Sequence, residues 1–132
     1  MLTSLQTNEQ DIWSHKSMDK KFVTPELNHL ETFVWYPKVD LFDNNATIEA
    51  LTQLVKELGL TVIDTQKHTF TPQGLSIIFL LAESHMGVHT WPEHEFFHID
   101  FLTCGKPLSQ EKVRDILTTL FHPEKIDIKK HD

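Results

Sequence analysis

Residues 75–105 read LSIIFLLAESHMGVHTWPEHEFFHIDFLTCG, and this stretch decides the fold. The apolar run 75–82 is too short for a typical isolated helix, so it predicts a strand buried on both faces. Residues 96–103 predict another strand, which a Cys-Gly-Lys-Pro break ends. If the polar residues between them stay extended through Pro92, alternate side chains share one face. The connections are short, and this favours antiparallel pairing, because parallel neighbours need a long crossover.

Two amphipathic helices flank this stretch. The first begins after Asn44 or Asn45, either of which can cap it, and ends at Gly59. The second begins after Ser109 and ends before Pro123. Their apolar residues recur at three- and four-residue spacing: Ile48, Leu51, Val55 and Leu58 in the first helix, and Val113, Ile116, Leu117, Leu120 and Phe121 in the second.

Residues 33–36, 60–70 and 126–128 predict the remaining strands, so the order of elements is β-α-β-β-β-β-α-β. Because each helix is apolar on one side only, both can cover the same face of a single sheet. We therefore expect the α+β class, as a two-layer sandwich with a mostly antiparallel sheet covered on one face by two helices. Residues 1–28 show no lasting period and predict an N-terminal extension to a domain at 29–132.

Charge and composition exclude several functions. The 132-residue chain has a formal net charge of −7, whereas a nucleic-acid-binding surface needs clustered Lys and Arg. A single cysteine, Cys104, precludes an intramolecular disulfide and fits a reducing compartment. No secretory signal precedes the domain, and the longest apolar run is far shorter than a membrane span. We expect a cytoplasmic protein that binds neither nucleic acid nor membrane.

Reactive side chains gather in residues 83–93. An extended chain would project His85, His89, Trp91 and Glu93 from one face, as the lining of a ligand site. The alternative is an ordinary polar loop after a strand. A metal site is a further alternative, since His94 and His98 are near in sequence. Alternation is expected to send those two to the opposite face, and the His-Glu-x-x-His pattern is absent, so we expect no metal.

The motifs and their mutual spacing resemble the bacterial and archaeal S-adenosylmethionine decarboxylase proenzymes, a small pyruvoyl-dependent family. Similarity covers roughly residues 29–122. The matching segments are His68-Thr69-Phe70, Pro72-x-Gly74-x-Ser76, Glu83-Ser84-His85, His89-Thr90-Trp91-Pro92-Glu93 and Asp100-x-x-Thr103-Cys104-Gly105.

The resemblance implies that the chain cuts itself between Glu83 and Ser84, giving a β chain of residues 1–83 and an α chain of residues 84–132. Ser84 would attack the preceding carbonyl, and β-elimination would leave a pyruvoyl group as the cofactor. His89 is the implied base for this processing, and Ser76 is implied to help bind the oxyanion or ester intermediate.

The resemblance further implies that the pyruvoyl group forms a Schiff base with S-adenosylmethionine and drives its decarboxylation for polyamine (spermidine) synthesis. Cys104 is the implied proton donor. Phe70 and Glu93 match residues that line the nucleoside part of the pocket, and Trp91 is expected to bind substrate beside them. Family members are homodimers of processed protomers, often with pockets near the subunit interface.

Departures from the family pattern leave two alternatives open. Ile77 stands where Gly is common, and the bulky pair Phe97-His98 precedes Asp100, so the pocket could be narrower and accept arginine or ornithine instead. The other alternative is a catalytically silent regulatory homologue, against which the intact Ser84, His89 and Cys104 argue.

Overall fold

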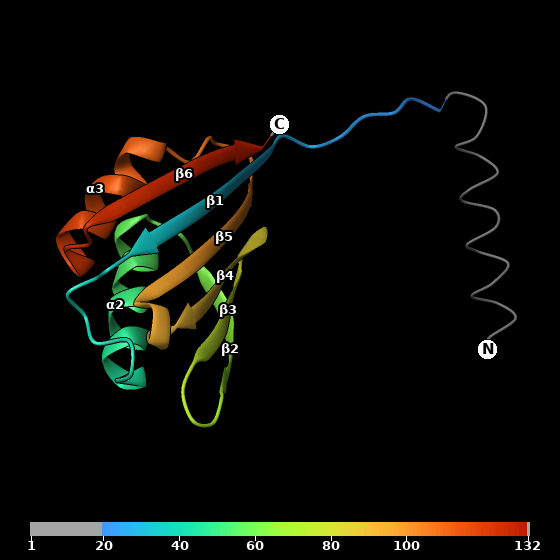
Figure 1. Cartoon of the computed structure of the whole chain (residues 1–132). Helices are drawn as coiled ribbons and strands as arrows, with labels where there is room; N and C mark the ends of the chain where they lie inside the picture. Colours follow the sequence, from blue (N-terminus) through green and yellow to red (C-terminus); the bar gives the residue numbers. More distant parts are fainter. Residues whose placement is uncertain (1–19, 132) are drawn as a thin grey trace, which may run out of the picture.

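The protein folds into one antiparallel sheet of six strands with two helices packed on it (Figure 1). The computed structural model describes residues 20–131. The strand order is β2-β3-β4-β5-β1-β6. The elements are β1 (Leu27–Trp35), α2 (Asn44–Glu57), β2 (Val62–Thr69), β3 (Leu75–Leu81), β4 (Ser84–Trp91), the 3₁₀ turn η1 (Pro92–His94), β5 (Phe96–Cys104), α3 (Gln110–Phe121) and β6 (Lys125–His131).

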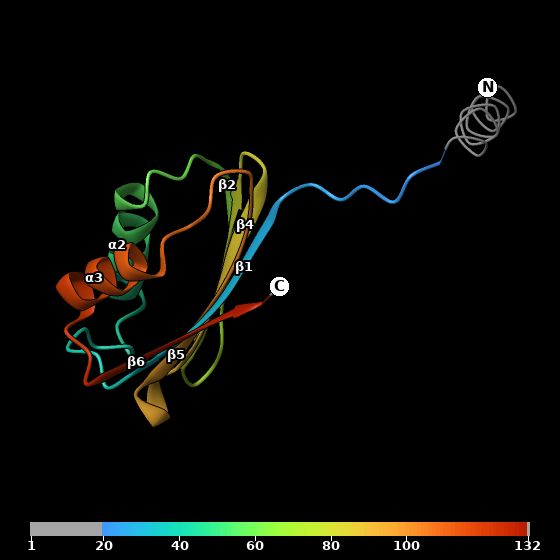
Figure 2. The ribbon, with the colours of Figure 1, turned by 90° about the horizontal axis from the view of Figure 1, so that it is seen from above.

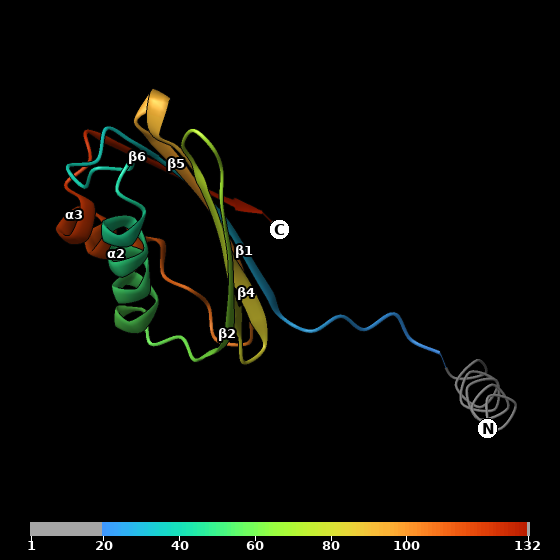
Figure 3. The same cartoon turned by 90° about the horizontal axis from the view of Figure 1, so that it is seen from below.

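Both helices lie on the same face of the sheet and leave the other face open (Figures 2 and 3). The core fills the layer between helices and sheet, where Leu51 and Leu117 meet Phe97 and Phe101. All four side chains are fully buried. The predicted α+β two-layer sandwich is confirmed.

The helix ends follow local hydrogen bonding. Asp43, rather than Asn44 or Asn45, caps α2, because its carboxylate accepts a hydrogen bond from the Ala46 amide at 3.0 Å. Ser109 caps α3 as predicted, accepting a bond from the Lys112 amide at 3.2 Å. Asn44 or Asn45 was expected as the cap of α2, and the structure places the residue before them there.

The prediction that residues 75–82 are buried on both faces is wrong. Leu75, Ile77 and Phe79 face the helices and are buried, but Ile78 and Leu80 are each 48% exposed on the open face. An apolar run does not distinguish a strand covered twice from one whose outer face awaits a partner. These exposed apolar side chains are relevant to whether two copies of the chain associate through the open face.

Extended geometry stops at Pro92, so the assumption that it continues to Glu93 is also wrong. Residues 92–94 form the 3₁₀ turn η1, and Glu95 follows in a left-handed conformation with φ of 46°. This turn changes the alternation between β4 and β5. As a result His98 lies on the same open face as His89, its register partner, and not on the opposite face as expected.

The chain enters the sheet at Leu27, two residues before the predicted domain start. Residues 20–26 lead up to β1 without helix or strand and extend away from the sheet (Figures 1–3). The rest of the predicted extension, residues 1–19, lies outside the described residues. Within residues 20–131, no helix is long and apolar enough to cross a membrane.

Candidate active site

The residues around the expected cleavage point lie where β3 turns into β4. Glu83 belongs to the two-residue turn, and Ser84 is the first residue of β4. The Ser84 hydroxyl donates a hydrogen bond to the carbonyl oxygen of Glu83. A nucleophile thus lies against the carbonyl group of the peptide bond that it would attack.

Cys104 lies at the same end of the sheet, because β5 runs antiparallel to β4 and finishes where β4 starts. Glu83, Ser84 and Cys104 line one cavity of about 270 Å³. Its other walls come from the loop after α2, the end of β3 with the turn that follows, and β5, namely Gly59, Leu60, Thr61, Leu81, Ala82 and Thr103. Cys104 is half-buried with a free thiol, so the expected proton donor and the expected cofactor position line the same cavity.

Ser76 and His89 form a second cluster, on paired positions of β3 and β4. The Ser76 Oγ and His89 Nδ1 atoms are 2.6 Å apart, which is hydrogen-bonding distance. Which atom donates depends on the tautomer of His89. If Nδ1 carries the proton and donates to Ser76, the other ring nitrogen, Nε2, is left with a lone pair and can serve as a base.

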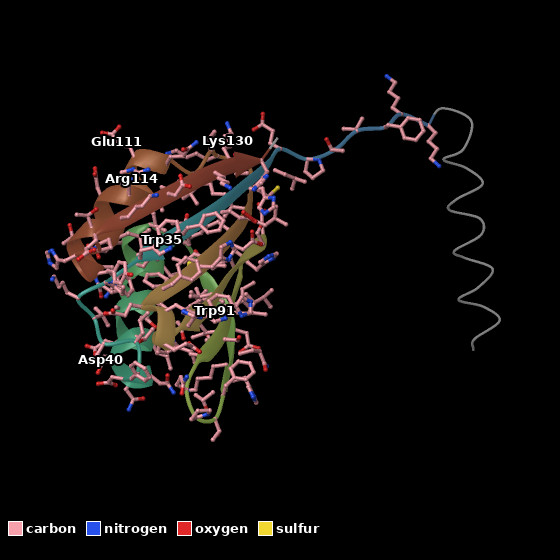
Figure 4. All side chains as sticks on the ribbon, in the orientation of Figure 1. Trp35, Asp40, Trp91, Glu111, Arg114 and Lys130 are labelled. Atoms are coloured by element: carbon pink, nitrogen blue, oxygen red, sulfur yellow. The ribbon has the colours of Figure 1, made fainter. Side chains whose placement is uncertain are left out.

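The expected substrate-binding residues surround this second cluster. Phe70, Trp91 and Glu93 line a cavity of about 310 Å³ together with Ser76 and His89. Trp91 projects from the sheet in Figure 4, and its ring centroid is 6.2 Å from that of His89. Phe70 is 50% exposed and Trp91 41%, so both present aromatic surface to a ligand.

The predicted site residues therefore fall into two groups at opposite ends of the β3–β4 hairpin. His89 comes five residues after Ser84 in β4, which at about 3.3 Å per residue is roughly 16 Å. That separation is too large for His89 to take a proton from residue 84 of its own chain. All these residues were expected in one site, whereas a single copy of the chain holds them in two separate groups.

Two residues expected to narrow the pocket do not reach it. Ile77 and Phe97 are fully buried and face the helices, as part of the core. The bulk at these positions fills space between the layers and lines neither cavity. This removes the reason for expecting a smaller substrate at these two positions, whereas His98, the third residue named, lies on the open face opposite His89.

The sequence alone missed two contributors to the site. The loop Gly59–Thr61 walls the Ser84 cavity, and Gln73 Nε2 lies 3.4 Å from Glu93 Oε2, where it orients that carboxylate. The segment Pro72-x-Gly74 pointed to a turn near Gln73, but nothing in the local pattern connects residues 59–61 with Ser84. No group of three or more His, Cys, Asp or Glu side chains within residues 20–131 is arranged to hold a metal ion.

Comparison with known proteins identifies the family. Residues 33–132 match the family model described as S-adenosylmethionine decarboxylase. A proenzyme of that name from Aquifex aeolicus is 39% identical over 84 residues, which cover 64% of this chain and 62% of the relative. Another from Methanococcus aeolicus is 34% identical over 101 residues, covering 76% of this chain and 86% of the relative.

Solved structures show the same fold. The crystal structure of the adenosylmethionine decarboxylase from Aquifex aeolicus aligns with a TM-score of 0.70 at 32% identity, covering 83% of this chain and 91% of that one. A Trypanosoma brucei AdoMetDC monomer aligns with a TM-score of 0.56 at 15% identity, covering 87% of this chain and 55% of that one, a likeness of fold alone. The chain belongs to the S-adenosylmethionine decarboxylase family.

Proposed function

We propose that the chain is an S-adenosylmethionine decarboxylase proenzyme that makes its own pyruvoyl group at Ser84. The observation that carries this proposal is the shared cavity of Ser84 and Cys104, with the Ser84 hydroxyl against the Glu83 carbonyl. A structural serine in a turn has no need of a thiol beside it. Relatives named as proenzymes support the same reading.

In the cleavage step, Ser84 Oγ attacks the carbonyl carbon of Glu83 and the amide becomes an ester. A base then removes the α-proton of residue 84, the C–O bond breaks, and the upstream chain leaves with a carboxylate end. Water replaces the nitrogen left on residue 84, and ammonia is released. His89 is the base in this scheme, with Ser76 fixing its tautomer through the 2.6 Å bond.

Ser84 and Cys104 are separated from Ser76 and His89 by most of the length of β4. This separation supports a homodimer in which each site combines residues of both copies. His89 and Ser76 point from the open face, where Ile78 and Leu80 are also exposed. Contiguous apolar surface of this kind marks an interface. Packing two open faces together would bury it and could bring His89 of one copy to Ser84 of the other.

Co-expression tests this arrangement. We expect Ser84→Ala and His89→Gln chains, each uncut alone, to restore cleavage when expressed together with different tags. Only the His89→Gln chain should be cut, because it keeps Ser84 and borrows His89 from its partner. Intact mass identifies the cut chain. No cleavage in mixed dimers verified by light scattering would contradict the shared site.

The second cavity would then hold the nucleoside. Phe70 and Trp91 offer aromatic faces for an adenine ring and a sulfonium, and the Glu93 carboxylate can accept hydrogen bonds from two ribose hydroxyls. Once formed, a pyruvoyl group supplies a carbonyl that binds the substrate amine and withdraws electrons from the bond to the carboxylate. Cys104 holds the proton that the substrate carbon needs after CO₂ leaves. A reducing cytoplasm would keep this thiol free.

Carboxyl-labelled substrates test the reaction. We expect the purified, cut protein to release labelled CO₂ from S-adenosylmethionine and none above background from arginine or ornithine. Ile77 and Phe97 lie in the core, so they do not narrow a pocket in favour of the smaller amines. Release from arginine or ornithine alone would identify a sister enzyme. An uncut species of 15.4 kDa with no release would identify a silent homologue.

A further inference from the structure

Asp100 lies between two histidines on the open face of the sheet. Its Oδ1 atom is 2.7 Å from His29 Nε2, and its Oδ2 atom is 3.6 Å from His85 Nε2. The three residues come from three neighbouring strands, β1, β5 and β4. Neither His29 nor Asp100 has a part in the cleavage or decarboxylation chemistry described above.

Strand register explains how the carboxylate reaches both rings. His29 and His85 both pair with Leu102, and Asp100 lies two residues before it on β5. Each histidine therefore reaches diagonally back to Asp100, a distance that long side chains can span. The residue directly opposite Asp100 on β4 is Gly87, and no heavy atom outside its chain neighbours lies within 4 Å of where its Cβ would be. The space beside Asp100 is therefore open at Gly87.

After cleavage, His85 lies next to the new chain terminus. Cleavage before Ser84 turns the start of β4 into a free chain end. Ser84 pairs only with Leu81 of β3, and pairing with β5 starts at His85. A new chain terminus that is paired on one side only becomes disordered unless a further contact restrains it. His85 is the first residue of the new chain that is paired on both sides, and its side chain is the one beside Asp100.

We propose that Asp100, oriented by His29, anchors His85 and so holds the new chain end beside Cys104. This inference rests on the proposed cleavage at Ser84. Asp100 is a positioning residue here. In the uncut chain the covalent link to Glu83 restrains residue 84, so the anchor matters after cleavage and little before it.

The test compares amide hydrogen exchange of residues 84–91 in cut and uncut protein. Asp100→Asn in the cut protein is expected to speed exchange about fivefold, the upper end of what a partly exposed ion pair contributes. In the uncut Ser84→Ala background the same change should alter exchange less than about twofold, because the chain is continuous. Over residues 84–91, His85→Gln should match Asp100→Asn, and the double variant should add nothing further, because each variant removes the His85–Asp100 contact. Asp100→Asn also removes the contact with His29, but that contact joins β5 to β1 and not to β4.

Glu31→Gln is the matched control. Its carboxylate also faces two histidines, with Oε1 3.9 Å from His98 Nε2 and Oε2 3.6 Å from His131 Nε2. These contacts join β1 to β5 and to β6, and neither of those strands begins at the cleavage point. The hydrogen exchange of residues 84–91 should therefore stay as in the parent protein. Turnover gives a second readout: Asp100→Asn should lower kcat by tenfold or more at little changed KM, because misplacing reacting atoms by about 1 Å can cost about 10²-fold.

Three results would overturn the anchor. Unchanged exchange in cut Asp100→Asn would show that the carboxylate does not hold the chain end. Equal acceleration in cut and uncut protein would show an ordinary structural contact. A parent chain that stays whole would refute the cleavage itself, and with it the anchor, and intact mass separates this outcome from the other two.

Discussion

Ser84→Ala is expected to leave the chain uncut, as a single species of about 15.4 kDa without decarboxylase activity. Alanine keeps the backbone of β4 but lacks the hydroxyl that lies against the Glu83 carbonyl. Without that nucleophile no ester forms, and with no ester there is no leaving group for the elimination. The loss should therefore be complete, in contrast to the partial losses expected when a positioning residue is changed.

Intact mass and a hydrazine probe for ketones measure this result. The parent should give two fragments, one of which reacts, whereas the variant should give one unreactive species. Ser109→Ala is the matched control, because it removes a hydroxyl from the cap of α3. It should cost about 1 kcal/mol of stability and leave cleavage intact. Two fragments from Ser84→Ala would refute the proposed nucleophile.

Cys104→Ala is expected to separate processing from turnover. Cleavage needs Ser84 and a base, so two fragments should still form. Decarboxylation should slow by 10²-fold or more, the order of magnitude that a positioned acid or base contributes. The KM should change little, because the aromatic and carboxylate groups expected to bind substrate line the other cavity.

Alkylation gives an independent check of the same thiol. Cys104 is the only cysteine in the sequence, so iodoacetamide on the cut protein modifies a single, known site. Modified protein should lose turnover and keep its two-fragment pattern. Cys104→Ser retains a proton but on a weaker acid, and it should lie between the parent and alanine. Full turnover in Cys104→Ala would exclude the thiol as proton donor.

Local pattern predicted the elements of this fold well. The three- and four-residue spacing placed both helices, and the order of strands and helices is the one observed. The errors arose where a local pattern has two spatial outcomes. Apolar residues 75–82 fit a strand covered on either one face or both, and the side that His98 takes depends on a 3₁₀ turn that no period reveals.

For the candidate site too, the sequence predicted the residues but not their arrangement in space. The resemblance to the family's motifs and their spacing named Ser84, His89 and Cys104 as the expected reactive side chains. It could not show that Ser84 shares a cavity with Cys104 while His89 lies at the far end of the hairpin. Which side chains meet depends on antiparallel register, since β5 finishes where β4 begins.

By itself the sequence determined the order of helices and strands, the α+β class and the side chains expected to do the chemistry, because hydrophobic period and side-chain type act locally. Tertiary structure alone decided which of those side chains meet. The Ser84 cavity lies apart from the Ser76–His89 pair. Ile77 and Phe97 lie in the core. Asp100 lies between His29 and His85. The physical reason is that these contacts join strands through register and twist, which only the folded sheet establishes.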